Sequence, residues 1–171
     1  KRMPAYTALQ DDPTLVTRLM DMSPVGILML DVGGAITFAN RRAEEILNLT
    51  KGQLSGTAYN AAVWHITSFD GSPFPDDDLP FFKVRTTLQP VFDVRHAVEV
   101  APGVRRFLSI NAAPLQDGTG RLEGVIATIN EVSAEVVAEK ARERAEERVH
   151  LIVDAAPFGV HMYELGDGDR L

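Results

Sequence analysis

Residues 19–31 of this chain read Leu19-Met-Asp-Met-Ser-Pro-Val-Gly-Ile-Leu-Met-Leu-Asp31, and residues 35–40 read Ala35-Ile-Thr-Phe-Ala-Asn40. Pro24 ends a helix, because proline disfavours helical geometry in the residue before it. The apolar run that follows predicts a buried strand, and the Gly33-Gly34 pair provides the positive φ of a tight hairpin before a second strand. Asn40 is a good N-terminal cap for a further helix. This stretch therefore predicts a helix end, a β-hairpin and a helix start in succession.

The same pattern begins again near the end of the chain. Residues 152–164 read Ile152-Val-Asp-Ala-Ala-Pro-Phe-Gly-Val-His-Met-Tyr-Glu164, in which Pro157 and Gly159 take the places of Pro24 and Gly26. Internal repetition of this kind indicates a repeated structural unit. We expect one complete module followed by the truncated start of a second at residues 152–171, so the sequence is interpreted as a piece of a longer chain.

Composition and charge narrow the class of protein. A length of 171 residues, with 45% hydrophobic and 24% charged residues, suits one globular domain with extensions. The sequence has no cysteine, which excludes disulfides and cysteine-ligated zinc and fits a reducing cytoplasm. A net charge of −7 without a Lys/Arg cluster argues against a nucleic-acid partner. No stretch of apolar residues is long enough to predict a membrane span.

The N-terminal part of the chain predicts a lead-in and a short helix. Residues 1–11 form the lead-in, and Asp12 caps a helix that has Pro13 at its first position. The apolar side chains of this helix share one stripe, formed by Leu15, Val16, Leu19 and Met20. The stripe could face the sheet of its own module or a second copy of the chain, and the sequence leaves both alternatives open.

Residues 41–90 predict small helices around an irregular middle. Ala43, Ile46 and Leu47 share a face of the helix that follows Asn40, and residues 63–67 predict a short strand. The acidic run at residues 76–78 caps a longer helix over Leu79–Leu88. This run could also bind a hard cation through its carboxylates, but a solvated capping turn explains it more simply.

The next part of the chain predicts three antiparallel strands. They span residues 91–100, 104–115 and 121–132, and a Pro-Gly pair and an Asp-Gly-Thr-Gly turn separate them. Because side chains alternate between the two faces of a strand, Leu108, Ile110 and Ala112 lie on one face and are expected to face the helices.

From Ser133 the sequence becomes charged and helical. Like-charged pairs at i,i+4, such as Glu139–Glu143 and Lys140–Arg144, give this helix little stability of its own. Its small apolar side chains form a linker seam with heptad spacing and one stutter, made of Ala134, Ala138, Ala141, Ala145, Val149 and Ile152. We predict a parallel two-stranded coiled coil over residues 133–151. The alternative is a single helix that is solvated or lies on its own domain.

The order of these elements resembles the PAS sensory domain, and short phrases along residues 12–150 agree with it. They are Ser23-Pro-Val-Gly-Ile27, Ile36-Thr-Phe-Ala-Asn40, Ala43-Glu-Glu-Ile-Leu-Asn-Leu49, Leu54-Ser-Gly56, Trp64 with the Asp70-Gly71 turn, and Glu131-Val-Ser133. Asn48 stands where the family usually has Gly, and Glu131-Val-Ser133 stands where it has Asp-Ile-Thr. The resemblance implies an α+β fold over residues 12–132, with a five-stranded antiparallel sheet of order 2-1-5-4-3, helices on one face, an N-terminal helix and a long C-terminal linker helix.

The resemblance also implies a function in signal transduction. The implied protein is a cytoplasmic sensory and dimerisation module that passes a signal through its linker helix to a downstream output domain. In this family the output domain is often that of a sensor histidine kinase in a two-component system or of a diguanylate cyclase. We expect a homodimer formed through the N-terminal and linker helices. Residues 131–133 (Glu131, Val132 and Ser133) are the predicted signal junction. No nucleophile–base pair or phosphate-binding loop is visible, so the module itself is expected to be non-catalytic.

The sequence argues against two kinds of cofactor but does not identify one. Without cysteine, the adduct chemistry of flavin photosensors is excluded. The longer helix contains no His, which argues against haem, and we assign His65 and His96 to surface or edge positions. The identity of any cofactor stays open.

The alternative function is that of a receptor for a small ligand or cofactor. The ligand would lie between the sheet and the longer helix, the concave place in this fold. The candidate liners are Met29, Phe38, Trp64, Phe82, Phe92, Phe107, Ile110 and Asn111. For most of these side chains ordinary core is the favoured explanation, because protein interiors are close-packed.

Overall fold

The computed structural model describes residues 13–155 and divides into two units between Ala134 and Glu135. The lead-in and most of the expected second start lie outside the described residues. The helices are α2 (Pro13–Asp21), α3 (Arg41–Leu47), α4 (Lys51–Leu54), α5 (Pro80–Thr87) and α6 (Ser133–Ala155), with 3-10 turns η1 (Ala62–Trp64) and η2 (Asp76–Asp78). The strands are β1 (Gly26–Asp31), β2 (Ile36–Ala39), β3 (Val91–Ala101), β4 (Val104–Gln116) and β5 (Leu122–Glu131).

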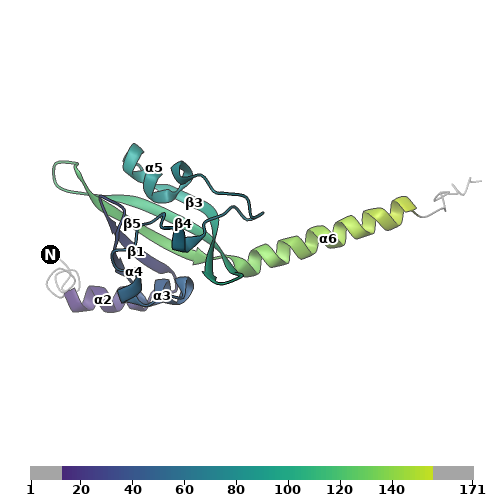
Figure 1. Cartoon of the computed structure of the whole chain (residues 1–171), viewed down its shortest axis with the longest axis horizontal. Coiled ribbons are helices and arrows are strands. Elements are labelled where there is room, and N and C mark those ends of the chain that lie inside the picture. The colour runs from purple at the N-terminus through teal and green to yellow at the C-terminus, as the bar shows by residue number, and fades with distance from the viewer. Residues whose placement is uncertain (1–12, 156–171) are drawn as a thin grey trace, which may run out of the picture. The chain divides into compact units, whose positions relative to one another are not determined.

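The five strands form one antiparallel sheet in the order β2-β1-β5-β4-β3 (Figure 1). This order and the α+β class confirm the predicted fold. The central strand β5 pairs with β1 on one side and with β4 on the other. Helix α3 packs on β1, α4 on β2, and α5 on β4 and β5. The helices therefore cover the face of the sheet that carries its buried side chains.

The β1–β2 hairpin closes as the glycine pair predicts. The Asp31 carboxylate accepts hydrogen bonds from the backbone N–H groups of Gly33 and Ala35, at 2.9 and 3.0 Å. Gly34 has φ +88°, and a Cβ atom on it would lie 2.5 Å from Cδ1 of Tyr59. Glycine is therefore needed here for its backbone conformation and for the close approach of an aromatic ring.

Asn40 holds the start of the domain together. Its fully buried side chain caps α3 by accepting a hydrogen bond from Ala43 N at 2.9 Å and also accepts one from Ile27 N at 2.8 Å. Its amide donates to the carbonyl oxygens of Met20, at 2.7 Å, and Val25, at 3.1 Å. One side chain thus bonds to backbone groups from the end of α2, from β1 and from α3, and so joins the three elements.

The inner face of the sheet carries the core. Leu108, Ile110 and Ala112 are all buried, which confirms that this set faces the helices. Strand β5 adds Val125, Ala127 and Ile129 on the same side by its register with β4. The opposite face carries mostly half-buried side chains at the intervening positions, and Ser109 there is buried.

The segment before α5 differs from the prediction. Residues 62–64 form the 3-10 turn η1 instead of a strand, and His65 ends it with φ +41°, a left-handed conformation that a regular strand does not adopt. Only Thr67 then pairs with the sheet, through an isolated bridge to Ala97 on β3. The acidic residues form η2, and α5 begins just after them, with Lys83 ion-paired to Asp78 at 3.0 Å.

Helix α6 is continuous over 23 residues and passes the predicted end of the linker at Leu151. Its seam side chains are exposed from Ala134 to Val149, the latter to 61%. Of the helices in the described part of the chain, none has both the length and the apolar character needed to cross a membrane.

Candidate functional site

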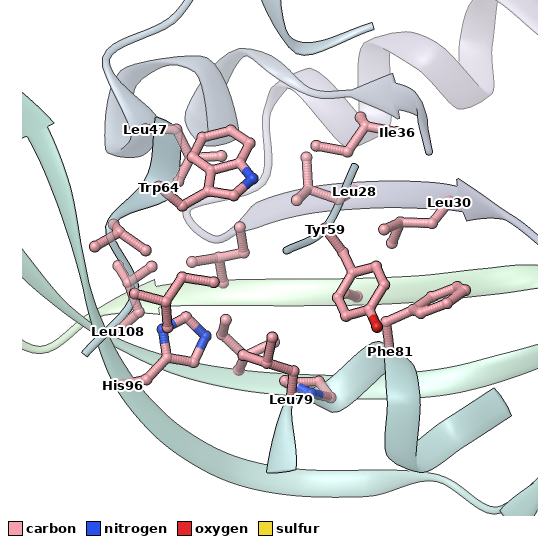
Figure 2. A pocket seen from close by; sticks show the side chains of 16 residues that line it. Leu28, Leu30, Ile36, Leu47, Tyr59, Trp64, Leu79, Phe81, His96 and Leu108 are labelled. Atoms are coloured by element: carbon pink, nitrogen blue, oxygen red, sulfur yellow. The ribbon is translucent and has the colours of Figure 1, made fainter. Parts of the chain in front are cut away.

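A cavity of about 80 Å³ lies between the sheet and the helical side of the domain (Figure 2). Strands β1, β3, β4 and β5 each contribute buried side chains to one wall. Strand β2 contributes its first residue, Ile36. The other wall comes from α3, from the irregular segment between α4 and α5, and from the start of α5. Principal lining residues are Leu28, Leu47, Tyr59, Trp64, Phe81, His96, Leu108 and Ile110.

His96 is the polar side chain of the sheet wall. It is 4% exposed, and its Nδ1 atom has no hydrogen-bond partner among the described residues. The ring of Phe74 lies 5.4 Å away, between ring centroids. Burial lowers the pKa of His96 from its usual value to about 4, and the backbone of Ala97 offsets this only in part. The imidazole is therefore neutral at pH 7.

Tyr59 and Trp64 form the aromatic part of the opposite wall. The Tyr59 ring packs on Phe81 with centroids 4.5 Å apart, and Trp64 Nε1 donates a hydrogen bond to the carbonyl oxygen of Ala58 at 2.8 Å. Burial, with a smaller contribution from the Asp76 carboxylate, raises the pKa of Tyr59, so its hydroxyl stays protonated. The cavity wall is thus apolar apart from a neutral imidazole and a phenol.

Trp64 and Ile110 are the candidate liners that the structure places in the cavity wall. Four other candidates project from the opposite face of the sheet, as the register shows: Met29 pairs with Phe38 and Ile126, Phe107 with Ala97, and Asn111 with Thr128. The placement of Met29, Phe38, Phe107 and Asn111 in the cavity is therefore wrong, because strand alternation puts them one position out of phase with the core.

The last two candidate liners also lie outside the wall. Phe82 is next to Phe81 on α5, and the turn of about 100° between neighbouring helical residues brings Phe81 to the cavity instead. Phe92 is 72% exposed, beside a register shift at Asp93, whose φ of +50° marks an irregular strand. His96 does lie on an edge strand, β3, but its assignment to the surface is wrong, because its side chain is buried inward.

The acidic run at η2 does not gather into a metal site. Asp76 accepts a hydrogen bond from Asn60 at 2.9 Å, and Asp78 is paired with Lys83. Across the described residues, no group of three His, Asp or Glu side chains lies close enough together to hold an ion.

The predicted junction is bound to strand β4 by short hydrogen bonds. Val132 N donates to Phe107 O at 2.8 Å, and Phe107 N donates to the Ser133 hydroxyl at 3.1 Å. The same hydroxyl donates to a Glu131 carboxylate oxygen at 3.1 Å. Ser133, the first residue of α6, is therefore fixed to the sheet.

Arg106 joins this junction to helix α3. Its guanidinium donates to the carbonyl oxygens of Glu45 and Ile46 at the end of α3, at 2.6 and 2.7 Å, and lies 3.6 Å from the Glu131 carboxylate. Both charged side chains are about 70% buried, which makes this pair stronger than a surface ion pair. The next residue of α3, Leu47, lines the cavity. A short path of direct contacts thus runs from the cavity wall to the start of α6.

The family model described as the PAS fold matches residues 14–132 of this sequence. The chain belongs to the PAS family. PAS domains are sensory modules of signalling proteins, which confirms the predicted function at that level. No curated protein matches the chain.

Solved structures agree in fold with this PAS domain. The PAS domain of nitrogen regulation protein NR(II) from Vibrio parahaemolyticus is 18% identical, with a TM-score of 0.53 over 69% of this chain and 98% of that one. An RNA-binding light-oxygen-voltage receptor is 15% identical, with a TM-score of 0.64 over 88% and 41%. The PAS domain of an HTR-like protein from Haloarcula marismortui is 14% identical, with a TM-score of 0.53 over 76% and 99%. At these identities the likeness concerns the fold alone.

Proposed function

We propose that this PAS domain is a sensory and dimerisation module that passes a signal through α6 to an output domain. The observation that carries the proposal is the fixed start of α6: Ser133 and Glu131 are hydrogen-bonded to each other, and β4 and Arg106 hold them to the domain. A change in the packing of α3 or the sheet would therefore alter the geometry at which α6 leaves the domain.

The character of α6 supports pairing with a second copy. Its sequence combines like-charged i,i+4 pairs with an exposed seam that includes Ala141, Ala145 and Val149. A single helix gains little from such charges, whereas two parallel helices bury the seam and can pack closely across alanines. The stutter interrupts the regular heptad packing of such a pair. A helix pair with two packings of similar energy can be shifted by a few kcal/mol of differential binding.

Sedimentation velocity of the full chain tests the dimer. We expect a concentration-dependent dimer at micromolar concentration, and we expect the Ala141→Gln/Ala145→Gln double variant to be monomeric, because two long side chains disrupt a close-packed alanine seam. The matched control is Glu143→Gln/Glu147→Gln, on the other side of the helix, which should keep the dimer. A wild-type chain that sediments as a monomer at every concentration would refute this function.

The resemblance to PAS modules of signalling proteins is the basis for proposing what kind of protein contains this domain. We place it in the cytoplasm as part of a signal-transduction protein, with a histidine kinase or diguanylate cyclase as the output that the family commonly carries. The absence of cysteine agrees with a reducing compartment.

The second candidate function is that of a small-ligand receptor. The specific observation in its favour is the cavity, whose wall includes the buried imidazole of His96, with an Nδ1 atom that has no partner among the described residues. Mass spectrometry of an extract from the purified, denatured protein tests for an endogenous occupant, and its failure would leave the dimerisation test unaffected.

A further inference from the structure

Residues 65–74 form a strap that crosses the edge of the sheet at β3. The strap lies between two buried residues, Trp64 and Leu79, which are 6% and 2% exposed and both line the cavity (Figure 2). None of the strap residues themselves is buried. The strap pairs with β3 through one isolated bridge, in which Thr67 and Ala97 exchange backbone hydrogen bonds of 3.0 and 2.7 Å. It is therefore flanked by buried residues and held by few contacts between them.

The strap contacts both faces of the sheet. On the cavity side, the Phe74 ring lies 5.4 Å from the ring of His96, between centroids. On the opposite face, the Phe69 ring meets the Phe107 ring edge-on, with centroids 5.0 Å apart. Ala97 has its side chain on that opposite face, because its neighbour His96 points to the cavity. Ala97 is 0% exposed although β3 is an edge strand, which fits a strap that covers the sheet at this point.

Arg105 on β4 fastens the strap to the face opposite the cavity. Its guanidinium donates hydrogen bonds to Thr67 Oγ1 at 2.6 Å and to the carbonyl oxygen of Ser68 at 2.8 Å. The same guanidinium lies 5.3 Å from the centre of the Phe107 ring, within the range of a cation–π interaction. Phe69 and Arg105 therefore both connect the strap to one residue of β4, Phe107.

Phe107 is also the residue that holds the start of α6. Its carbonyl oxygen accepts the hydrogen bond from Val132 N at 2.8 Å, and its own N–H donates to the Ser133 hydroxyl at 3.1 Å. The side chain of Phe107 thus contacts the strap, while its backbone contacts the junction. Because hydrogen bonds weaken steeply as their angle departs from linearity, a shift of Phe107 would weaken both bonds to the junction.

The strap has the properties of a segment that opens while the rest of the domain stays folded. Local opening requires least free energy where few side chains are buried and where the backbone hydrogen bonds are few and near solvent. The strap fits this description, whereas β4 and β5 carry the buried core. Opening would break the Thr67–Ala97 bridge, the two hydrogen bonds of Arg105 and the contact between Phe69 and Phe107.

We propose that the strap is a regulatory element that opens locally, and that its opening loosens the start of α6 through Phe107. The closed strap holds the Phe107 ring and keeps Val132 and Ser133 bonded to β4. The open strap releases the ring and weakens both bonds. This inference rests on the signalling function proposed above and adds the element that regulates it. Any interaction that favours one state of the strap would shift the junction by its differential affinity.

Amide hydrogen exchange of the full chain, followed residue by residue by NMR, tests this coupling. Phe69→Ala should speed the exchange of the Ala97 and Val132 N–H groups by about tenfold, a change of the size expected for losing one aromatic pair. Arg105→Gln should act on the same two groups in the same direction. The N–H of Ala127, in the core of the central strand β5, should exchange as slowly as in the wild type.

Phe92→Ala is the matched control, because it removes a 72% exposed aromatic side chain from β3 outside the strap. It should leave the exchange of all three N–H groups unchanged. Faster exchange at Ala97 without any change at Val132 would mean that the strap opens without reaching the junction, which overturns the inference. Equal acceleration at Ala127 would also overturn it, because the strap would then open only when the whole domain unfolds.

The wild-type chain alone provides a second test if a variant fails to fold. At low urea concentrations, the N–H groups of Ala97, Phe107 and Val132 should share one opening free energy, lower than that of Ala127. Different opening free energies for Ala97 and Val132 would contradict the coupling. The sedimentation experiment on α6 does not depend on the strap, so failure of the signalling proposal and failure of this inference can be told apart.

Discussion

At the scale of single residues, the neutral state of His96 makes stability depend on pH. Its folded-state pKa of about 4 lies below the ordinary value of 6.5. Above pH 6.5 both states are neutral and His96 contributes nothing. As the pH falls below 6.5, the unfolded chain takes up a proton that the folded chain does not, so stability decreases until the pH reaches about 4.

The size of this effect can be measured at pH 5. There the His96 contribution should lower the free energy of unfolding by about 2 kcal/mol relative to pH 7.5. Urea unfolding at the two pH values should show this loss in the wild type but not in His96→Leu. The exposed carboxylates with lowered pKa, such as Asp117, barely titrate at pH 5 and are common to both proteins. Equal losses in the two proteins would show that His96 is not buried as a neutral side chain.

Asn40 gives a second prediction at this scale. Asn40→Ala removes a helix cap and takes away the side-chain partners of the part-buried Ile27 N on β1 and of Met20 O at the end of α2. We expect it to lower the free energy of unfolding by about 3 kcal/mol or more. Asn60→Ala, which removes one exposed side-chain contact with Asp76, is the matched control and should cost less than about 1 kcal/mol. Similar losses in the two variants would refute the role given to Asn40.

The inward orientation of the His96 side chain could have been predicted from the sequence, but the polarity of histidine argued against it. Val94, His96 and Val98 alternate along one strand, so the period-two rule places the imidazole on the same face as two valines. Treating histidine as a surface or edge residue overrode that pattern. Tyr59, by contrast, lies in an irregular segment with no period to assign its side chain to a face.

At the scale of elements, the β1–β2 hairpin can be tested by a pair of glycine substitutions. Gly34→Ala requires an unfavourable φ and drives a Cβ atom into Tyr59 and Phe81. We expect a loss of about 2–4 kcal/mol in thermal or urea unfolding. Gly118→Ala meets no atom within 4 Å and should change stability by less than about 0.5 kcal/mol. A tolerated Gly34→Ala would mean that Tyr59 does not pack against the hairpin.

The connection between α3 and the junction depends on Arg106. Arg106→Gln should weaken the bonds to Glu45 O and Ile46 O and remove the pairing with Glu131. We expect a modest stability loss of about 1–2 kcal/mol, with faster amide exchange at the end of α3 and the start of α6. Arg121→Gln in the β4–β5 turn is the control. Unchanged exchange at both helix ends would show that Arg106 does not couple them.

The order of elements was predictable because local signals agree with it. Proline, the glycine pair and the Asn40 cap mark boundaries that depend on neighbouring residues only. The cavity wall was harder to predict, because choosing aromatic residues by size ignored the face on which each one lies. Phe81 and Phe82 illustrate this: the two are equally apolar, and only the rotation of α5 decides which one reaches the cavity.

At the scale of the whole molecule, contacts within the PAS domain run from the cavity wall to the residues at which α6 begins. Leu47 lines the cavity, and the carbonyl oxygens of the two residues before it bond to Arg106, which pairs with Glu131 at the junction. A ligand shifts such a system only by its differential affinity for two arrangements. The proposed function therefore requires that α6 take part in a defined assembly.

Cysteine cross-linking measures that assembly most directly, because the chain has no native cysteine. In a parallel, in-register coiled coil, each seam residue meets its own counterpart across the axis, within the reach of a disulfide. Ala145→Cys should therefore form a covalent dimer rapidly under mild oxidation, while Glu143→Cys, on the other side of α6, should remain largely monomeric. Equal cross-linking of the two variants, or none in either, would contradict a dimer formed through the linker seam.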